Sequence, residues 1–420
     1  MLFKNLCESS IIARFCRILS LETISSNESR DLIYDAAANM VAEAERFSMG
    51  GDLWELFFAL AVILDENPVC RIYERRPFQG DLFAMLAADL WSTHRRVQAL
   101  KDLVAWDSVF EPLRTLVDFS PRNGESHLRQ KHSLDDVLLL ASRFAAAGSQ
   151  NEMVSALGAF CEKRGAGKFA LEAAFTWDSG SKSLVPIDDT DPQTLASLIG
   201  YESQKTELLA NTESFLRGNQ SNNVLLFGDS GTGKSSSVRA LLNEPDFVRR
   251  GLRMIELRHD QFEEIPDIMR AIRERNYRFI LFMDDLSFEE FEVRYKHLKA
   301  LIEGGLERKP DNAVVYATSN RRKIIREVWQ DRAASSDDVH GRDTMQEKQS
   351  LADRFGMMIW YPSVSKDEYL SIVRAIAEET GLSFEDSEMN KLAMRWELER
   401  GFTGRAARQF VYHMLQRRTG

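Results

Sequence analysis

Residues 223–242 read NVLLFGDSGTGKSSSVRALL, and this stretch decides the fold. Its middle, Gly228 to Ser235, matches the phosphate-loop pattern G-x-x-x-x-G-K-[ST] at every fixed position. The apolar run before the loop predicts a short buried strand, and the run after it predicts a helix. The stretch therefore predicts a strand, a glycine loop and a helix, in that order.

Such a loop suits a nucleotide, because its N–H groups and the positive end of the helix dipole point at an anion. Lys234 adds a positive charge for the β- and γ-phosphates, and the Ser235 hydroxyl is placed to ligate Mg²⁺. We therefore expect ATP and Mg²⁺ as cofactors. The predicted phosphate-binding residues are Gly228, Asp229, Ser230, Gly231, Thr232, Gly233, Lys234, Ser235 and Ser236.

The composition is that of a globular chain with roughly two or three domains. A net charge of −10 argues against a surface coated with basic groups for nucleic acid. The four cysteines are scattered and no HExxH motif is present, which suits a reducing cytosol without structural zinc. The longest apolar run, residues 53–64, is too short to span a bilayer, and the first residues do not resemble a signal peptide. We expect a cytoplasmic protein with no membrane partner.

The first part of the chain, residues 1–165, is predicted to form a mainly helical N-terminal domain. Apolar residues recur there at spacings of three and four in residues 30–47, 53–64, 82–103 and 134–144. Residues 166–192 are predicted to form a hairpin and a linker, because the runs FALEAAFTW and SLVPI flank a turn at residues 178–181.

Residues 193–364 are predicted to form the nucleotide-binding α/β domain. Short apolar runs recur along it, and helix-like segments separate most of them. This alternation predicts a five-stranded parallel sheet with helices on both faces. The predicted strands are residues 223–227, 254–257, 278–283, 313–317 and 357–360.

Two of these strands end in polar residues that suit catalysis. Asp284 and Asp285 follow the third strand, at the edge where the phosphate loop also lies. We predict that Asp284 binds Mg²⁺ and that Asp285 orients or deprotonates the attacking water. Asn320 ends the fourth strand, where its amide would hold the attacking water and the γ-phosphate together.

Two further segments are expected to contact the nucleotide. Ile199 and Gly200, about twenty-five residues before the loop, either contact the adenine or begin an ordinary helix. Residues 365–420 are predicted to form a helical lid from residues 366–380, 383–400 and 403–416. Arg405, at the start of the last of these helices, would then be carried back to the phosphates.

Together these motifs resemble the AAA+ ATPases. By that resemblance Asn320 corresponds to sensor 1, Arg354 to the arginine finger and Arg405 to sensor 2. Longer strings are similar to a bacterial AAA+ family catalogued as domain of unknown function 815, and this similarity covers residues 165–420. The strings are IGYESQK (199–205), GDSGTGKSS (228–236), DDLSFEE (284–290), YATSNRR (316–322), SLADRFG (350–356) and GRAARQF (404–410).

The resemblance implies an ATPase that switches conformation or remodels a client, either protein or DNA. An arginine finger implies a homo-oligomer such as a ring, in which Arg354 completes a neighbouring site; this fails if Arg354 only caps its own strand. Asp285 stands where AAA+ proteins usually have glutamate, and its side chain is one methylene shorter. The alternative is therefore a slow or non-hydrolysing module that is gated by ATP and recruits a partner through its N-terminal helices.

Overall fold

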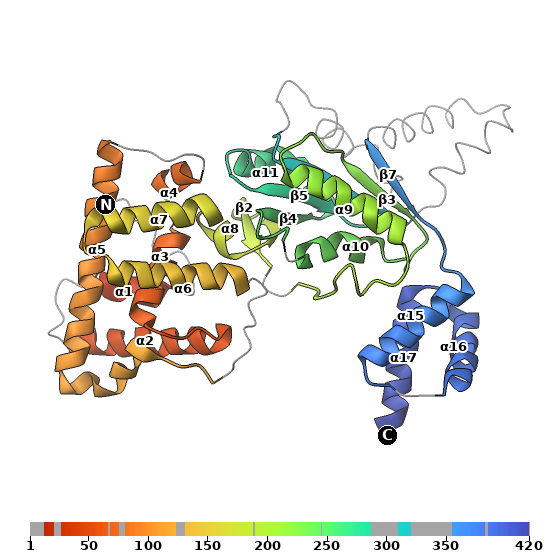
Figure 1. Cartoon of the computed structure of the whole chain (residues 1–420), viewed down its shortest axis with the longest axis horizontal. Helices are drawn as coiled ribbons and strands as arrows, with labels where there is room; N and C mark the ends of the chain where they lie inside the picture. The colour runs from red at the N-terminus through yellow and green to blue at the C-terminus, as the bar shows by residue number, and fades with distance from the viewer. Residues whose placement is uncertain are drawn as a thin grey trace. The chain divides into compact units, whose positions relative to one another are not determined.

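A computed structural model describes residues 12–20, 27–65, 68–74, 80–122, 131–187, 190–244, 246–286, 310–320, 355–382 and 385–419. The chain divides into two compact units, Met1–Ala173 and Ala174–Gly420. Figure 1 shows the helices and strands of each unit. Each unit has its own apolar core. The finer division into four parts stays a prediction.

The first unit is built from helices around α3 (Leu53–Leu64), whose side chains from Leu53 to Ile63 are all buried. Asp52 caps this helix by accepting hydrogen bonds from two N–H groups of its first turn. The four helices expected here are confirmed as α2 (Asn27–Phe47), α3, α5 (Asp81–Trp106) and α6 (Lys131–Ala146). The other elements of the unit are α1 (Ala13–Leu19), α4 (Pro68–Tyr73), the 3-10 helix η1 (Ser108–Asp118), α7 (Gln150–Arg164) and α8 (Lys168–Leu171).

One carboxylate is buried on the otherwise apolar α3. Glu55 lies 2.9 Å from Nε2 of His94, and Lys101 donates to its other oxygen at 3.0 Å. Burial acts to raise the pKa of Glu55, but these partners outweigh it and lower the pKa. Within the described ranges, no helix is long and apolar enough to cross a membrane.

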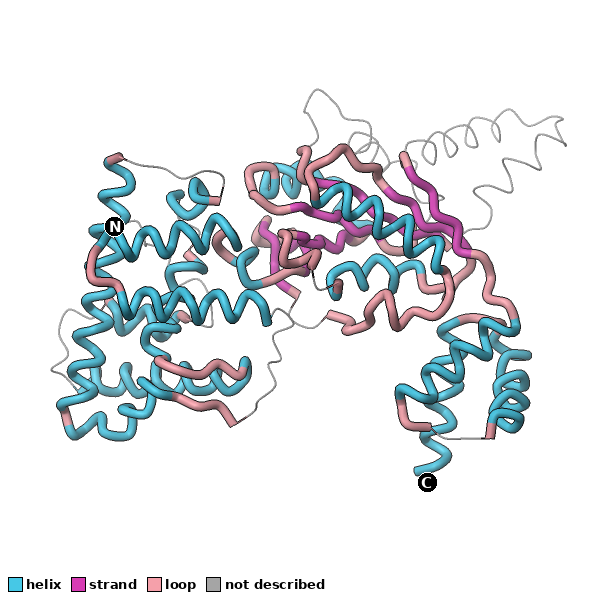
Figure 2. Tube along the Cα trace, viewed as in Figure 1, coloured by secondary structure: helices cyan, strands magenta, loops and turns pink. Residues whose placement is uncertain are grey.

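The second unit contains one sheet, whose strands are magenta in Figure 2. The strand order is β2-β1-β4-β5-β6-β3-β7. All neighbouring strands pair in parallel except β1 and β2, which form the expected hairpin. The α/β class is therefore confirmed. The strands are β1 (Ala174–Asp178), β2 (Ser183–Pro186), β3 (Val224–Gly228), β4 (Leu252–Leu257), β5 (Arg278–Met283), β6 (Ala313–Ser319) and β7 (Met357–Tyr361).

The predicted count of five strands was wrong, because the hairpin joins the sheet. β1 pairs in parallel with β4, from Ala174 opposite Met254 to Thr176 opposite Glu256. Gln261 secures this edge by donating to the Trp177 carbonyl oxygen at 2.7 Å. The hairpin therefore extends the described sheet beyond β4, and its second strand, β2, forms that edge.

Both faces of the central strands are covered. Ile280 and Phe282 of β5 pack in a core with residues of α9 (Glu202–Leu216) and α10 (Lys234–Ala240). Phe279 and Leu281 alternate with them along β5 and point to the opposite face of the sheet. They are equally buried, so this face is covered too. The remaining described helices of this α/β part are η2 (Leu241–Asn243), η3 (His259–Glu264) and α11 (Ile265–Ile272).

The three helices predicted in residues 365–420 are confirmed as α15 (Lys366–Glu379), α16 (Asp386–Arg400) and α17 (Gly404–Thr419), and we call them the lid. Ser365 and Glu368 form a capping box that starts α15. The helices share an apolar core that includes Tyr369 and Phe410.

The hydroxyl of a buried tyrosine joins the sheet to α9, and removing this hydroxyl should lower the stability of the second unit. The Tyr316 hydroxyl on β6 lies 3.0 Å from Asn211 Nδ2 and 2.8 Å from Thr212 Oγ1. We expect Tyr316→Phe to lower the free energy of unfolding by about 1 kcal/mol, because two buried polar groups lose a partner. Urea unfolding of the full chain measures this, with the half-exposed Tyr412→Phe as control. Equal stability of the two variants would contradict the role of this hydroxyl.

Candidate nucleotide-binding site

The predicted phosphate loop connects β3 to α10 at the carboxyl end of the strand. Its glycines adopt positive φ angles, 147° at Gly228, 77° at Gly231 and 90° at Gly233, which residues with a Cβ rarely adopt. At Gly228 a Cβ would also lie 2.0 Å from the Tyr361 carbonyl oxygen on β7. The conformation of the loop therefore depends on glycine and on the neighbouring strand.

The Lys234 ammonium is buried and folded back onto the loop. It donates to the carbonyl oxygens of Gly228 at 3.1 Å and Asp229 at 2.6 Å. Burial, with a smaller contribution from the charge of Arg405, lowers the pKa of Lys234 to about 8, although the nearby aspartates act to raise it. An anion in the loop would favour the charged form of this lysine.

The Asp284 carboxylate lies where β5, β6 and α10 meet. Its Oδ1 accepts hydrogen bonds from Ser235 Oγ at 2.5 Å and from Thr318 Oγ1 at 2.6 Å. Arg239 donates to Oδ2 at 3.0 Å and also to Glu256 Oε1 at 2.9 Å. Ser235 and Arg239, one helical turn apart on α10, thus hold both oxygens of one carboxylate.

Arg239 was not predicted from the sequence as part of this site. The only signal in the sequence is its spacing of four residues from Ser235, which places both side chains on one face of α10. Its guanidinium also lies 5.3 Å from the centre of the Phe282 ring.

The Asp285 carboxylate and the Asn320 amide meet directly. Asn320 Nδ2 donates to Asp285 Oδ1 at 2.5 Å, and the Asp285 N–H donates to Thr318 Oγ1 at 2.9 Å. Asp285 has a positive φ of 54°, a strained conformation for a residue other than glycine. The ends of β5 and β6 therefore bring together the two residues that the sequence placed beside the attacking water.

The phosphate loop and the ends of β5 and β6 line a cavity that also reaches Ile199 and Gly200. These two residues lie in a segment at the other end of this cavity. The buried Lys205 shapes this segment by donating to the Leu198 carbonyl oxygen at 2.7 Å. Tyr201, which sequence reasoning missed, also lines the cavity; its hydroxyl donates to the Pro362 carbonyl oxygen at 2.9 Å. With Leu198, Val364 and two lid side chains (Ile372 and Ile376), these residues make this end of the cavity largely apolar.

The lid touches the phosphate loop at the start of α17. The Gly404 N–H donates to the Gly231 carbonyl oxygen at 3.1 Å. A Cβ at Gly231 would lie 3.0 Å from the Thr403 side chain, so a larger residue at this position would crowd the contact between loop and lid. Arg405 follows immediately and lines the cavity.

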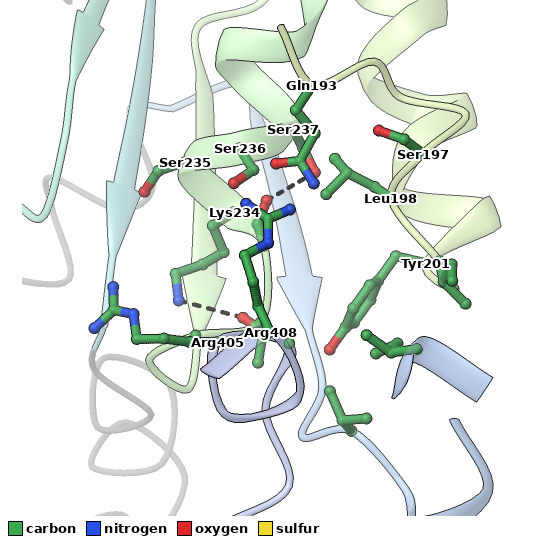
Figure 3. Close-up of a pocket in the computed structure, with 18 of the residues that line it drawn as sticks. Gln193, Ser197, Leu198, Tyr201, Lys234, Ser235, Ser236, Ser237, Arg405 and Arg408 are labelled. Atoms are coloured by element: carbon green, nitrogen blue, oxygen red, sulfur yellow. Dashed lines mark hydrogen bonds between the residues drawn. The ribbon is translucent and has the colours of Figure 1, made fainter. Parts of the chain in front are cut away.

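Most of the predicted site residues line one cavity of about 450 Å³ (Figure 3). Gly228 and Asp229 do not line it; the Asp229 side chain instead accepts a hydrogen bond from Ser363 at 2.5 Å. Arg354 lies outside the described residues. The predicted residues that line the cavity are Ser230, Gly231, Thr232, Gly233, Lys234, Ser235, Ser236, Ile199, Gly200, Asp284, Asp285, Asn320 and Arg405.

The described residues contain no cluster of three or more histidine, cysteine or acidic side chains suited to a metal ion. The oxygens of Ser235 and Asp284 are nevertheless the hard donors that Mg²⁺ prefers, and they lie 2.5 Å apart beside the loop. Such a pair suits a cation whose remaining ligands are phosphate oxygens and water.

A family profile described as "Protein of unknown function (DUF815)" matches residues 170–418. The chain belongs to this family. The match confirms the relationship recognised from the sequence and covers the α/β part and the lid as far as residue 418. A short segment is also similar to the replication factor C large subunit of Methanococcus vannielii, with 39% identity over 61 residues. This segment is 14% of this chain and 12% of that protein, so the chain spans a small part of its relative.

Solved structures similar to this chain include three from different proteins. The Thermotoga maritima RuvB Holliday junction branch migration motor is 19% identical, with a TM-score of 0.35, covering 53% of this chain and 63% of that one. C. elegans PCH-2 is 16% identical, with a TM-score of 0.35, covering 51% and 62%. The FIGL-1 AAA domain in complex with ADP is 17% identical, with a TM-score of 0.35, covering 51% and 70%.

The lowered pKa of Lys234 predicts a pH dependence of stability in the nucleotide-free protein. Between about pH 8 and 10.5 the folded state binds fewer protons than the unfolded state, so its stability rises with pH. We expect wild type to gain on the order of 1 kcal/mol relative to Lys234→Met between pH 8 and 10, and nothing below pH 7. Urea unfolding of both proteins at several pH values measures this. Parallel stability curves would mean that Lys234 keeps its ordinary pKa.

Proposed function

We propose that this chain binds ATP with Mg²⁺ and hydrolyses it to ADP and phosphate, and that the resulting conformational change remodels a protein or DNA client. The observation that supports this proposal is that the predicted catalytic and phosphate-binding groups meet in one place. The phosphate loop, the Asp285–Asn320 pair and the lid arginine Arg405 line one cavity. Its apolar end suits a base, and its charged end suits a triphosphate.

The residues present fit the nucleotide and its metal. Lys234 and Arg405 supply positive charge, and the N–H groups around Gly231 and Gly233 supply donors for phosphate oxygens. Ser235 and Asp284 would hold Mg²⁺, which when bound neutralises charge on the phosphates. Arg239 fixes the second oxygen of Asp284, so the carboxylate is oriented before the metal binds.

Hydrolysis would use the strand ends and the lid. Asn320 would hold the attacking water, and Asp285 would orient it and accept its proton. Lys234 and Arg405 would stabilise the negative charge that develops on the γ-phosphate oxygens. Arg354 of a neighbouring copy would complete the site, which makes the active form a homo-oligomer such as a ring.

A second function is favoured by the geometry of Asp285. Its carboxylate is shorter than the usual glutamate, its backbone is strained and its Oδ1 is engaged by Asn320. These features suit slow water activation. In this alternative the chain holds ATP, and the closed lid allows the N-terminal helices to recruit a partner.

Turnover separates the two functions. We expect Asp285→Asn to lower the hydrolysis rate about 100-fold, because general-base catalysis is lost, while ATP affinity changes little. Phosphate release measures the rate, and calorimetry measures the affinity. Lys234→Ala, which should bind no nucleotide, sets the background. If wild type binds ATP but hydrolyses no faster than this background, the gated module is correct.

The role of Arg354 predicts a rate that depends on concentration. We expect the rate per subunit to rise as an oligomer forms, and to fall about 1,000-fold in Arg354→Ala without loss of the oligomer. Light scattering on the samples used for the assay measures the assembly. A constant rate from a monomer, unchanged in the variant, would rule out a shared site.

A further inference from the structure

The last lid helix, α17, presents one face to the nucleotide cavity. Side chains at spacings of three and four residues share a face of a helix. The other side of α17, with Ala407 and Phe410, packs into the lid core. The cavity-lining residues of this helix include Arg405, Arg408, Gln409 and Tyr412.

The two arginines on this face reach different parts of the cavity (Figure 3). Arg408, half-buried, extends along the start of α10 toward Ser236. Arg405, exposed, extends past the Lys234 ammonium. After burial, the charge of Arg405 is a further cause that lowers the pKa of Lys234, which agrees with this placement.

The phosphates of a bound nucleotide lie in a known order along a phosphate loop, so the position of each arginine indicates which phosphate it would contact. The loop lysine reaches the β- and γ-phosphates, and N–H groups at the start of the following helix reach back toward the α-phosphate. Arg405 lies on the lysine side, toward the γ-phosphate. Arg408 lies on the Ser236 side, and Leu198 of the apolar end also lines the cavity there.

We propose that Arg408 is a second nucleotide-binding arginine of the lid and that it binds the α-phosphate. This inference rests on the proposed nucleotide site. A guanidinium suits the role because its planar N–H groups can donate two hydrogen bonds to one phosphate. In the sequence, Arg408 stands out only as part of the string GRAARQF, and no role was predicted for it.

The two arginines would then respond to different chemical events. The γ-phosphate near Arg405 leaves on hydrolysis, whereas the α-phosphate near Arg408 is common to ATP and ADP. Arg408 therefore holds the lid on the nucleotide before and after hydrolysis. Full lid release requires the departure of ADP, not only of phosphate.

Calorimetry on the full chain tests this with ADP and the non-hydrolysable analogue AMP-PNP, both with Mg²⁺. We expect Arg408→Gln to weaken both ligands by a similar factor of about 10, because one charge-assisted contact is lost from each. Arg405→Gln should weaken AMP-PNP by at least that factor and ADP by much less. The matched control is Arg417→Gln on the same helix, an exposed residue that does not line the cavity and should change neither affinity.

Each outcome has one meaning. If wild type binds neither ligand, the proposed function fails. If wild type binds but Arg408→Gln keeps both affinities within twofold, only the role of Arg408 is overturned. Loss of AMP-PNP affinity alone would move Arg408 to the γ-phosphate and also overturn the assignment. Arg408→Lys, which keeps the charge, should restore part of both affinities, and a melting temperature equal to wild type excludes unfolding as the cause.

Discussion

The parallel register of three neighbouring strands holds the site together. β6 pairs with β5 through Ala317 and Met283, and with β3 through Ser319 and Phe227. Because the three strands are aligned in this register, the residues at their carboxyl ends meet at one edge of the sheet. There the Thr318 hydroxyl donates to the Asp284 carboxylate and accepts a hydrogen bond from the Asp285 N–H. A shift of one residue would turn these side chains to the opposite face of the sheet and separate the groups.

The cavity beside this edge has two chemical halves, and the lid contributes to both. Apolar lid side chains such as Ile372 face the segment at Ile199, and lid arginines face the phosphate loop. The Gly404–Gly231 hydrogen bond joins the lid to the phosphate loop. A ligand with a base at one end and phosphates at the other would therefore hold the lid at two points.

The site carries an electrostatic cost at Lys234, which an anion would relieve, and backbone strain at Asp285. Lys234 is buried with a lowered pKa, and Asp285 is held at positive φ. Asp284 avoids a similar cost, because two hydroxyls and the Arg239 guanidinium satisfy its oxygens. Such strained or desolvated groups are typical of places where binding energy is used.

The amino-acid sequence by itself determined the local elements of this protein. The loop at residues 228–235, the strands around it, the hairpin and the lid helices follow from glycine positions and apolar periodicity, which depend on near neighbours in the chain. Their order also placed Asp284, Asp285 and Asn320 at one edge, because parallel strands end on the same side.

Only the tertiary structure decided which distant groups touch. It joined the hairpin to β4, turned Asp229 toward Ser363, and brought Arg239 and Arg408 to the cavity. No short pattern marks these contacts, since each depends on the relative placement of elements far apart in the chain. Their physical basis is edge pairing between strands, the reach of long cationic side chains and the closing of the lid helices over the loop.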